Sequence, residues 1–330
     1  MRRKKITEEL DPKIDYMFMS IHDKDNIRLK ESMRESCVAF LDILGFKEMI
    51  KNDIDRVIFL SRFLKAFKNF YFRSPTNFEI NKSSLPKATM FSDSIILSAE
   101  IDKYFDFYNF AYAIAELQAT LLKENIVLRG GIEVGSLYHN APFVFGEGLL
   151  NAYYLESKIA KYPRIVIGNG VLRELEKREN ERYDDYYFVH GTYRGLDFDS
   201  DIQRIISTEK NEDAFDEKLL AKLDDDTRKL IEAYKSVSYI DYLRYAFKKY
   251  EPLNISRQRE YSDEIDLYYD ELEPMIKFIK NGLLNDSQCV KQKYEWLKKA
   301  FNGALEMFIG RLKDKADQDY INFWIDKVIE

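Results

Sequence analysis

Two aspartates occupy positions at which a carboxylate could do chemistry. Asp42 closes an almost unbroken apolar run, and Asp93 stands between two later apolar segments. Two carboxylates that meet repel each other and raise each other's pKa. A divalent cation that binds both removes this repulsion, and Mg²⁺ favours one or two carboxylates together with waters and phosphate oxygens. The pair therefore predicts metal-assisted phosphate chemistry, if the fold brings Asp42 and Asp93 to one edge of a sheet.

The residues after Asp42 predict a phosphate site beside the metal. Leu44, Gly45 and Phe46 lead into a predicted helix, and the free N–H groups at a helix start attract anions. Gly45 also allows a ligand to approach the backbone closely. Aspartate before glycine equally favours an ordinary turn, and so does an aspartate at a hairpin tip. Each motif alone is therefore compatible with a purely structural role.

Short segments rich in β-branched and aromatic residues predict the strands that would position both aspartates. These segments are Cys37–Ile43, Lys87–Phe91, Ser94–Ala99, Val127–Gly135, Phe143–Phe145 and Arg164–Ile167. Only Ser92 and Asp93 separate the second segment from the third, which predicts a two-residue hairpin with Asp93 at its tip.

Helices are predicted between these strands, at Phe46–Phe72, Tyr104–Glu124, Glu147–Lys161 and Gly170–Arg178. This order predicts an α+β fold of the ferredoxin-like type, with a mixed or antiparallel sheet covered by helices. We expect an N-terminal arm at 1–36, a catalytic domain at 37–250 with a charged helical insertion near 197–235, and a helical C-terminal region at 251–330.

Composition excludes several classes of function. The 330 residues are 45% hydrophobic, enough for one large core or two modest ones. A net charge of −6 argues against a nucleic-acid partner. No apolar run approaches the length of a membrane span, so we expect no membrane contact. Two distant cysteines suit a reducing compartment and predict a cytoplasmic protein.

Four segments, in order, resemble the catalytic domain of class III nucleotide cyclases. They are FLDILGF (40–46), MFSDSIILSA (90–99), LRGGIEVGSLYH (128–139) and FGEGLLNAYYLESKIA (145–160). They are similar to the family's Asp-x-x-Gly-Phe strand end, its Gly-Asp hairpin (with Ser92 in place of glycine), its Arg-x-Gly-Ile strand and the helix that follows. The resemblance covers residues 37–167.

The resemblance implies a homodimer with its active sites between the subunits. It implies two Mg²⁺ or Mn²⁺ ions held by Asp42 and Asp93, with the Ile43 carbonyl as a further ligand. In this family the ribose 3′-hydroxyl attacks the α-phosphate and pyrophosphate leaves, with the ions stabilising the entering and leaving oxygens. Lys47 and Arg194 are basic candidates for contacts with the triphosphate.

The positions that select the base depart from both purine patterns of this family. Adenine-specific members carry Lys and Asp there, and guanine-specific members carry Glu and a small residue. Here the two positions hold Thr89 and Phe143. Because a site that cannot pair with a base edge leaves polar groups unsatisfied, we expect a pyrimidine nucleotide, UTP or CTP, with UTP slightly favoured.

The helix that would stabilise the transition state also departs from the family. The family's asparagine aligns with Leu150, next to Asn151, and its arginine aligns with Tyr154. Asn151 and Tyr154 are therefore candidate substrate contacts, with a role in catalysis for Tyr154. Arg129 and Arg164 are candidate replacements for the missing arginine, although each could equally be a structural strand residue.

Together these features, with the segments 148–167 and 239–243, resemble the pyrimidine cyclases of Pycsar anti-phage systems. That resemblance implies synthesis of cyclic UMP or cyclic CMP during infection, and a separate effector protein that reads the product. Three alternatives stay open. They are an adenylate or guanylate cyclase with atypical base contacts, a catalytically inactive nucleotide-binding regulator, and a helical scaffold whose C-terminal half binds a partner protein.

Overall fold

The computed structural model describes residues 33–72, 86–102, 107–140, 143–177, 205–248, 250, 261–312 and 318–330. Most of the predicted N-terminal arm lies outside these residues, as does Arg194. The arm's last three residues, 34–36, belong to the first strand.

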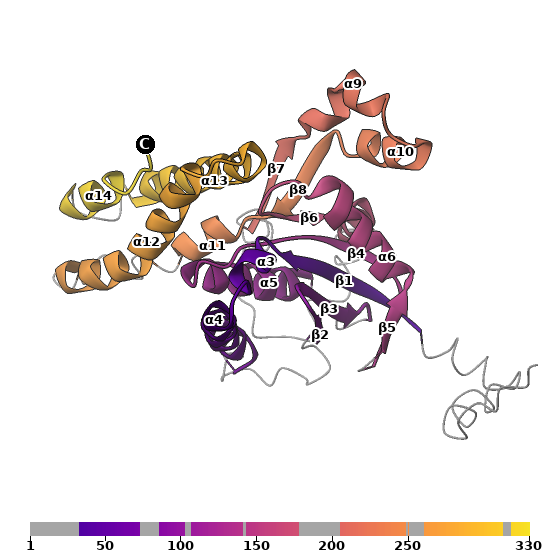
Figure 1. Ribbon diagram of the computed structural model, residues 1–330, viewed down its shortest axis with the longest axis horizontal. Helices are drawn as coiled ribbons and strands as arrows, with labels where there is room; N and C mark the ends of the chain where they lie inside the picture. The colour runs from indigo at the N-terminus through magenta and orange to yellow at the C-terminus, as the bar shows by residue number, and fades with distance from the viewer. Residues whose placement is uncertain are drawn as a thin grey trace, which may run out of the picture.

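A single mixed sheet forms the centre of the molecule (Figure 1). Its strands are β1 (Arg34–Ile43), β2 (Lys87–Phe91), β3 (Ser94–Glu100), β4 (Leu128–Asn140), β5 (Phe143–Gly146), β6 (Ile165–Ile167), β7 (Ile206–Lys210) and β8 (Ser236–Ile240). They lie in the order β2-β3-β1-β4-β6-β8-β7, with β5 paired to β4. Only the β4–β6 pair is parallel among the strands described. The β2-β3-β1-β4 order confirms the predicted ferredoxin-like α+β fold.

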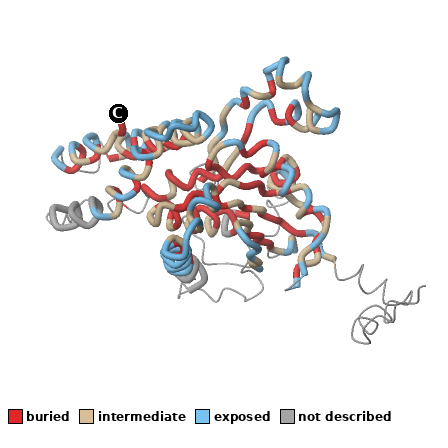
Figure 2. The backbone as a smooth tube through the Cα atoms, viewed as in Figure 1, coloured by how far each residue is buried: buried red, intermediate tan, exposed pale blue. Residues whose placement is uncertain are grey.

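Strand β1 is apolar from Cys37 to Leu41 because helices cover both faces of the sheet there. Cys37, Ala39 and Leu41 face the core that includes α4 (Asp53–Phe72) and α5 (Phe107–Lys123). Val38 and Phe40 face the opposite core beside α6 (Glu147–Tyr154). A strand buried on both faces loses the polar alternation of a surface strand. Figure 2 shows the resulting band of buried residues through the sheet.

The sequence Phe46–Phe72, predicted as one helix, is interrupted before Asp53. It forms the single turn α3 (Phe46–Met49) and then α4.

Helix α6 lies unusually close to β4 because glycines line the contact. A Cβ at Gly131 would collide with Leu155, and one at Gly135 would collide with Gly148. The helix then continues as a π-helical turn, Leu155–Ile159. Such turns are rare and occur frequently at functional sites.

The sequence predicted a helical insertion near 197–235, but the described part of this segment is not wholly helical. The helices α9 (Glu217–Leu220) and α10 (Asp225–Ala233) do lie in it, but β7 also comes from this segment and joins the sheet beside β8. Strand β7 is polar in sequence because it lies at the sheet edge, where charged side chains reach solvent. Figure 1 shows α9 and α10 beyond the ends of β7 and β8.

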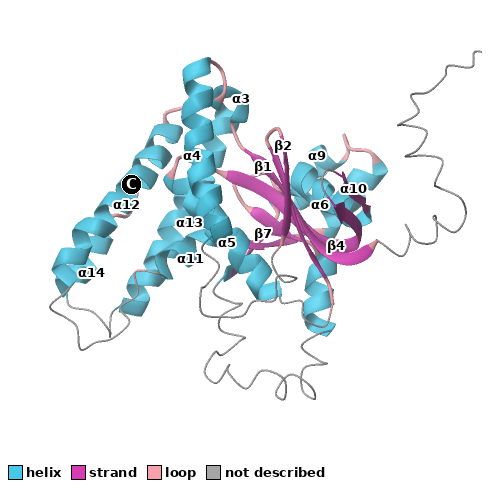
Figure 3. Cartoon of the chain, turned by 90° about the horizontal axis from the view of Figure 1, so that it is seen from below, coloured by secondary structure: helices cyan, strands magenta, loops and turns pink. Residues whose placement is uncertain are grey.

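The C-terminal region is helical, as predicted, and comprises α12 (Tyr261–Leu283), α13 (Gln288–Leu312) and α14 (Gln318–Ile325) (Figure 3). These helices follow α11 (Tyr242–Lys248) and share its core. Phe247 of α11 packs against Phe301, Phe308 and Trp324. One continuous core therefore crosses the predicted boundary near residue 250. None of the helices within the described ranges is long and apolar enough to span a membrane.

Candidate active site

The ends of β1 and β3 bring Asp42 and Asp93 together. In the antiparallel register Asp42 lies opposite Ser94, the residue that follows Asp93. The Ile43 N–H donates a hydrogen bond to the Asp93 carbonyl oxygen at 2.9 Å, which fixes the hairpin tip beside the end of β1. Burial raises the pKa of Asp42, and the nearby Asp93 charge raises it further. The topological condition set by the sequence is met: both aspartates stand at one end of adjacent strands.

Arg129 approaches the same point from the other side of β1. Strand β4 pairs with β1 so that Arg129 lies opposite Asp42, and its Nε donates to an Asp42 carboxylate oxygen at 3.1 Å. Its terminal nitrogen lies 2.7 Å from Glu156 Oε1. The guanidinium is therefore held between two carboxylates. The sequence named Arg129 as a candidate catalytic group, and the structure puts it in contact with a candidate metal ligand.

Glu156 is a site residue that the sequence did not identify. Its side chain is only 5% exposed and comes from the π-helical turn after α6. Burial raises the pKa of Glu156 to about 7; Arg129 opposes this rise, while Asp42 and Asp93 add to it. In the sequence, Glu156 is only one of the acidic residues of the segment 145–160. The π-helical turn that buries its side chain has no sequence pattern by which it could be predicted. Arg129 thus pairs with two carboxylates, Asp42 and Glu156, and the charge of Asp93 lies close to both, so the cluster favours a further cation.

The donor set fits Mg²⁺ or Mn²⁺. Among the residues with described positions, no three His, Cys, Asp or Glu side chains form a metal-binding group on their own. Mg²⁺ does not need one, because it commonly uses one or two protein carboxylates and completes its shell with waters and substrate phosphates. Asp42 and Asp93 supply that number. Arg129 would have to share or release Asp42 when a cation binds.

The turn after Asp42 offers fewer phosphate donors than predicted. The Ile43 and Leu44 N–H groups are used within the fold, by the carbonyls of Asp93 and Val127. Gly45 has a positive φ of 77° and starts α3, a helix of only four residues. Within the described part of the chain, the N–H groups of Gly45 and Phe46 make no backbone hydrogen bond. These two remain the available donors, without a helix dipole of useful length behind them.

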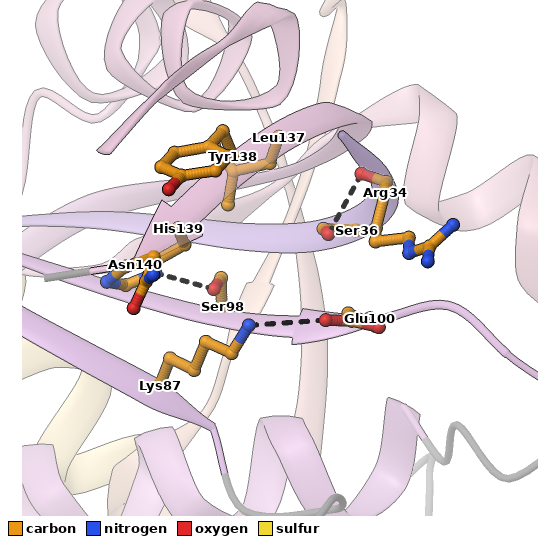
Figure 4. Close-up of a pocket in the computed structure, with 9 residues that line it drawn as sticks. All are labelled: Arg34, Ser36, Lys87, Ser98, Glu100, Leu137, Tyr138, His139 and Asn140. Carbon is orange, nitrogen blue, oxygen red and sulfur yellow. Dashed lines mark hydrogen bonds and ion pairs between the residues drawn. The ribbon is translucent and has the colours of Figure 1, made fainter. Parts of the chain in front are cut away.

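Thr89, a predicted base-reading residue, is tied to a histidine. Its hydroxyl lies 2.9 Å from His139 Nε2, and His139 Nδ1 lies 2.7 Å from the Ser98 hydroxyl. Burial lowers the pKa of His139, and the Lys87 charge lowers it further, so the ring is neutral at pH 7. His139 and Ser98 line a pocket of about 210 Å³, whose side chains are drawn in Figure 4. His139 was missed because a lone histidine in a strand carries no pattern.

Phe143, the second predicted base-reading residue, lies on the same hairpin as His139. It pairs with Asn140 at the β4–β5 turn, and its side chain is 48% exposed. The hydrogen bond between Thr89 and His139 therefore brings both predicted specificity residues to one end of the hairpin. Neither contacts Asp42 within the chain.

Asn151 and Tyr154 lie elsewhere. They line a separate pocket of about 480 Å³ that includes Lys158 and residues of α10, such as Thr227. Tyr154 is half-exposed. Within one chain, the structure does not bring these two predicted substrate contacts to the aspartates.

Arg164 is structural, which removes it as a candidate for the missing arginine. Its side chain is 2% exposed and is paired with Glu209. The guanidinium also lies over the rings of Tyr162 and Tyr239. Burial lowers the pKa of Arg164 to about 10. No substrate can reach this group. Lys47, the other basic candidate within the described ranges, is exposed on α3.

Comparisons with known proteins add little to this geometry. No protein-family model matches the chain, and no curated protein matches it. Among solved structures, the chain is similar to the crystal structure of the adenylyl cyclase CyaB from P. aeruginosa, with a TM-score of 0.32 and 13% identity. That match covers 44% of this chain and 82% of the other. A likeness this distant carries no argument about function, and the α+β fold rests on the strand pairing itself.

Proposed function

We propose that this protein is a class III-type nucleotide cyclase that converts a nucleoside triphosphate to a 3′,5′-cyclic nucleotide and pyrophosphate. One observation carries the proposal. Asp42 and Asp93 meet at the end of adjacent strands, beside a turn that offers the Gly45 and Phe46 N–H groups. Carboxylates next to free backbone donors suit a metal-bound polyphosphate.

Each residue of the site has a task in this reaction. Asp42 and Asp93 would hold Mg²⁺ or Mn²⁺, and the bound ion would lower the pKa of the attacking hydroxyl and stabilise charge on the leaving pyrophosphate. Gly45 and Phe46 donate to phosphate oxygens and orient the chain of phosphates. Arg129 fixes the Asp42 carboxylate in the resting protein, because its Nε holds one carboxylate oxygen at 3.1 Å. Such fixed dipoles and charges are the main source of catalysis in phosphoryl transfer.

We further propose that the substrate carries a pyrimidine base, with UTP slightly favoured over CTP as the substrate. The position that carries Lys or Glu in purine-specific relatives holds Thr89, whose hydroxyl is engaged by a neutral histidine. The bond to His139 therefore occupies one of the hydrogen-bonding positions of the Thr89 hydroxyl, and Thr89 carries no charge where purine-specific members carry Lys or Glu. The exposed Phe143 ring supplies a flat surface on which a small base can stack.

A homodimer would complete the site. Thr89 and Phe143 gather at the β4–β5 hairpin, Asn151 and Tyr154 on α6, and the aspartates at the end of β1. These groups do not meet in one chain. In a homodimer, a second copy would present one set to the other, which would place the active site at the interface. By the same resemblance, the product would act as a signal in anti-phage defence and be read by a separate effector.

The test is a product assay with all four nucleoside triphosphates. Purified protein with Mn²⁺ is incubated with each, and cyclic products are identified by mass spectrometry. Cyclic UMP or cyclic CMP as the main product supports the full proposal. Cyclic AMP or GMP alone would leave a cyclase and overturn the pyrimidine assignment. No product from any nucleotide would favour an inactive nucleotide-binding regulator.

A further inference from the structure

Helix α13 of the C-terminal region lies against the turn that follows Asp42. A small, partly open pocket of about 90 Å³ lies between them. Its walls come from the turn at Leu44 and Gly45, from Val127 and Pro163 below, and from the first half of α13, which contributes Val290, Lys293, Tyr294 and Leu297. The C-terminal region is thus a direct neighbour of the proposed phosphate site.

The position of α13 at this place is fixed by burial and by polar contacts. Leu297 is 1% exposed, and the Trp296 indole nitrogen lies 3.1 Å from a Glu209 carboxylate oxygen. The same indole stacks on Tyr162 with ring centroids 5.8 Å apart. Lys293 lies one helical turn before Leu297 and on the same face. Its side chain therefore extends from a rigid anchor toward the turn after Asp42.

Lys293 has no carboxylate partner among the described residues. The side chain is partly buried, and no ion pair is made by Lys293 among the residues whose positions are described. Burial raises the pKa of Asp42, and Lys293 is one of the cations, with Arg129, that oppose the rise. Arg129 already takes the direct contact with Asp42, so the ammonium is left close to the site yet uncommitted.

We propose that Lys293 binds the polyphosphate of the nucleotide held at Asp42 and Asp93, and that it does so from the same chain. An ammonium on a flexible stem is a compact point charge that suits phosphate oxygens. The proposal rests on the assigned cyclase site. It gives the C-terminal helices a role that the sequence left open, because α13 then forms one wall of the active site. It also predicts that Lys293, and not the exposed Lys47 on α3, is the main lysine contact with the triphosphate.

The test compares Lys293→Ala with Lys293→Arg and a matched control, Lys299→Ala. Lys299 lies on the same helix, carries the same charge and is exposed, six residues further along. Binding of inorganic tripolyphosphate with Mg²⁺ and of each nucleoside triphosphate is measured by calorimetry, beside steady-state kinetics. We expect Lys293→Ala to weaken tripolyphosphate binding and raise KM by about tenfold or more, as for one charged hydrogen bond. Lys293→Arg should recover much of the loss, and Lys299→Ala should behave as wild type.

The outcomes separate this inference from the cyclase proposal. If wild type makes cyclic product and Lys293→Ala matches it in KM and in tripolyphosphate binding, the lysine assignment is wrong and the cyclase stands. If wild type makes no product but binds tripolyphosphate in a manner that depends on Lys293, the phosphate site stands and the cyclase does not. If wild type binds neither tripolyphosphate nor any nucleoside triphosphate, the lysine assignment and the cyclase proposal are both overturned. Equal losses in Lys293→Ala and Lys299→Ala would reduce the effect to net charge and also reject the assignment.

Discussion

Replacing Arg129 with glutamine tests whether the site is built around a cation. Arg129 lies 3.1 Å from Asp42 and 2.7 Å from Glu156, and its side chain is 27% exposed. Removing one member of a buried ion pair costs about 3–5 kcal/mol. Two features reduce this cost: the site is partly solvated, and Glu156, with a pKa already near 7, can take up a proton. We expect Arg129→Gln to lower the free energy of unfolding by about 2–3 kcal/mol, discounted for that exposure.

The assay is thermal unfolding at pH 7, with EDTA and with Mn²⁺. The unfolding entropy is about 2.1 cal/mol/K per residue, so in a chain of 330 residues a loss of about 2–3 kcal/mol corresponds to a fall in Tm of roughly 3–4 °C. Because Mn²⁺ supplies the positive charge that the variant lacks, it should recover at least about half of that fall and stabilise the variant more than wild type. A suitable control is Arg56→Gln, which removes a fully surface ion pair with Asp53 and should change Tm little.

Two results would refute the reasoning. A variant as stable as wild type in EDTA would mean that the carboxylates do not depend on a local cation. A fall in Tm that Mn²⁺ leaves unchanged would mean that Arg129 is structural and that no metal site lies beside it.

Three further predictions follow from the same geometry. Asp42→Asn and Asp93→Asn should each abolish cyclic product in the mass-spectrometric assay while keeping the wild-type Tm in EDTA; residual turnover in either would remove it from the metal site. Thr89→Val should shift the ratio of products from mixed nucleoside triphosphates without lowering Tm by more than a few degrees; an equal loss with every nucleotide would show that Thr89 does not read the base. Burial raises the pKa of Asp241, so its contribution to stability is complete below its unfolded pKa and is lost as pH rises through the folded value. Asp241→Asn, which can still cap α11, should flatten that decline as pH rises above about 4 in urea unfolding. An unchanged profile would contradict the assignment of this pH dependence to Asp241.

The parts of the fold that follow from local pattern were predictable. The two-residue hairpin at Ser92-Asp93 set the relation of β2 to β3, and the unbroken apolar run of β1 marked a central strand. From these, the meeting of Asp42 and Asp93 followed by topology alone. Strand β7 was not predicted because its sequence is polar. Edge strands commonly carry charged side chains that reach solvent, so they lack the apolar pattern that marks a central strand.

The partners within the site were not predictable, because they depend on contacts between residues far apart in the chain. Glu156 reaches Arg129 only because the helix after Tyr154 opens into a π-helical turn. Arg164 is buried by Glu209, a residue of the missed edge strand. Lys293 comes to the site because a tryptophan one turn later packs into the sheet end. No periodicity in the sequence encodes such contacts.

The most direct test of the account is to locate the metal. Crystals grown with Mn²⁺ and a nucleoside triphosphate analogue that cannot cyclise would be measured for anomalous scattering. We predict density for Mn²⁺ within about 2–2.5 Å of carboxylate oxygens of both Asp42 and Asp93, with the phosphates on the same ion. Well-ordered analogue with no such density, or Mn²⁺ bound away from both aspartates, would contradict the central claim that these two carboxylates share a cation.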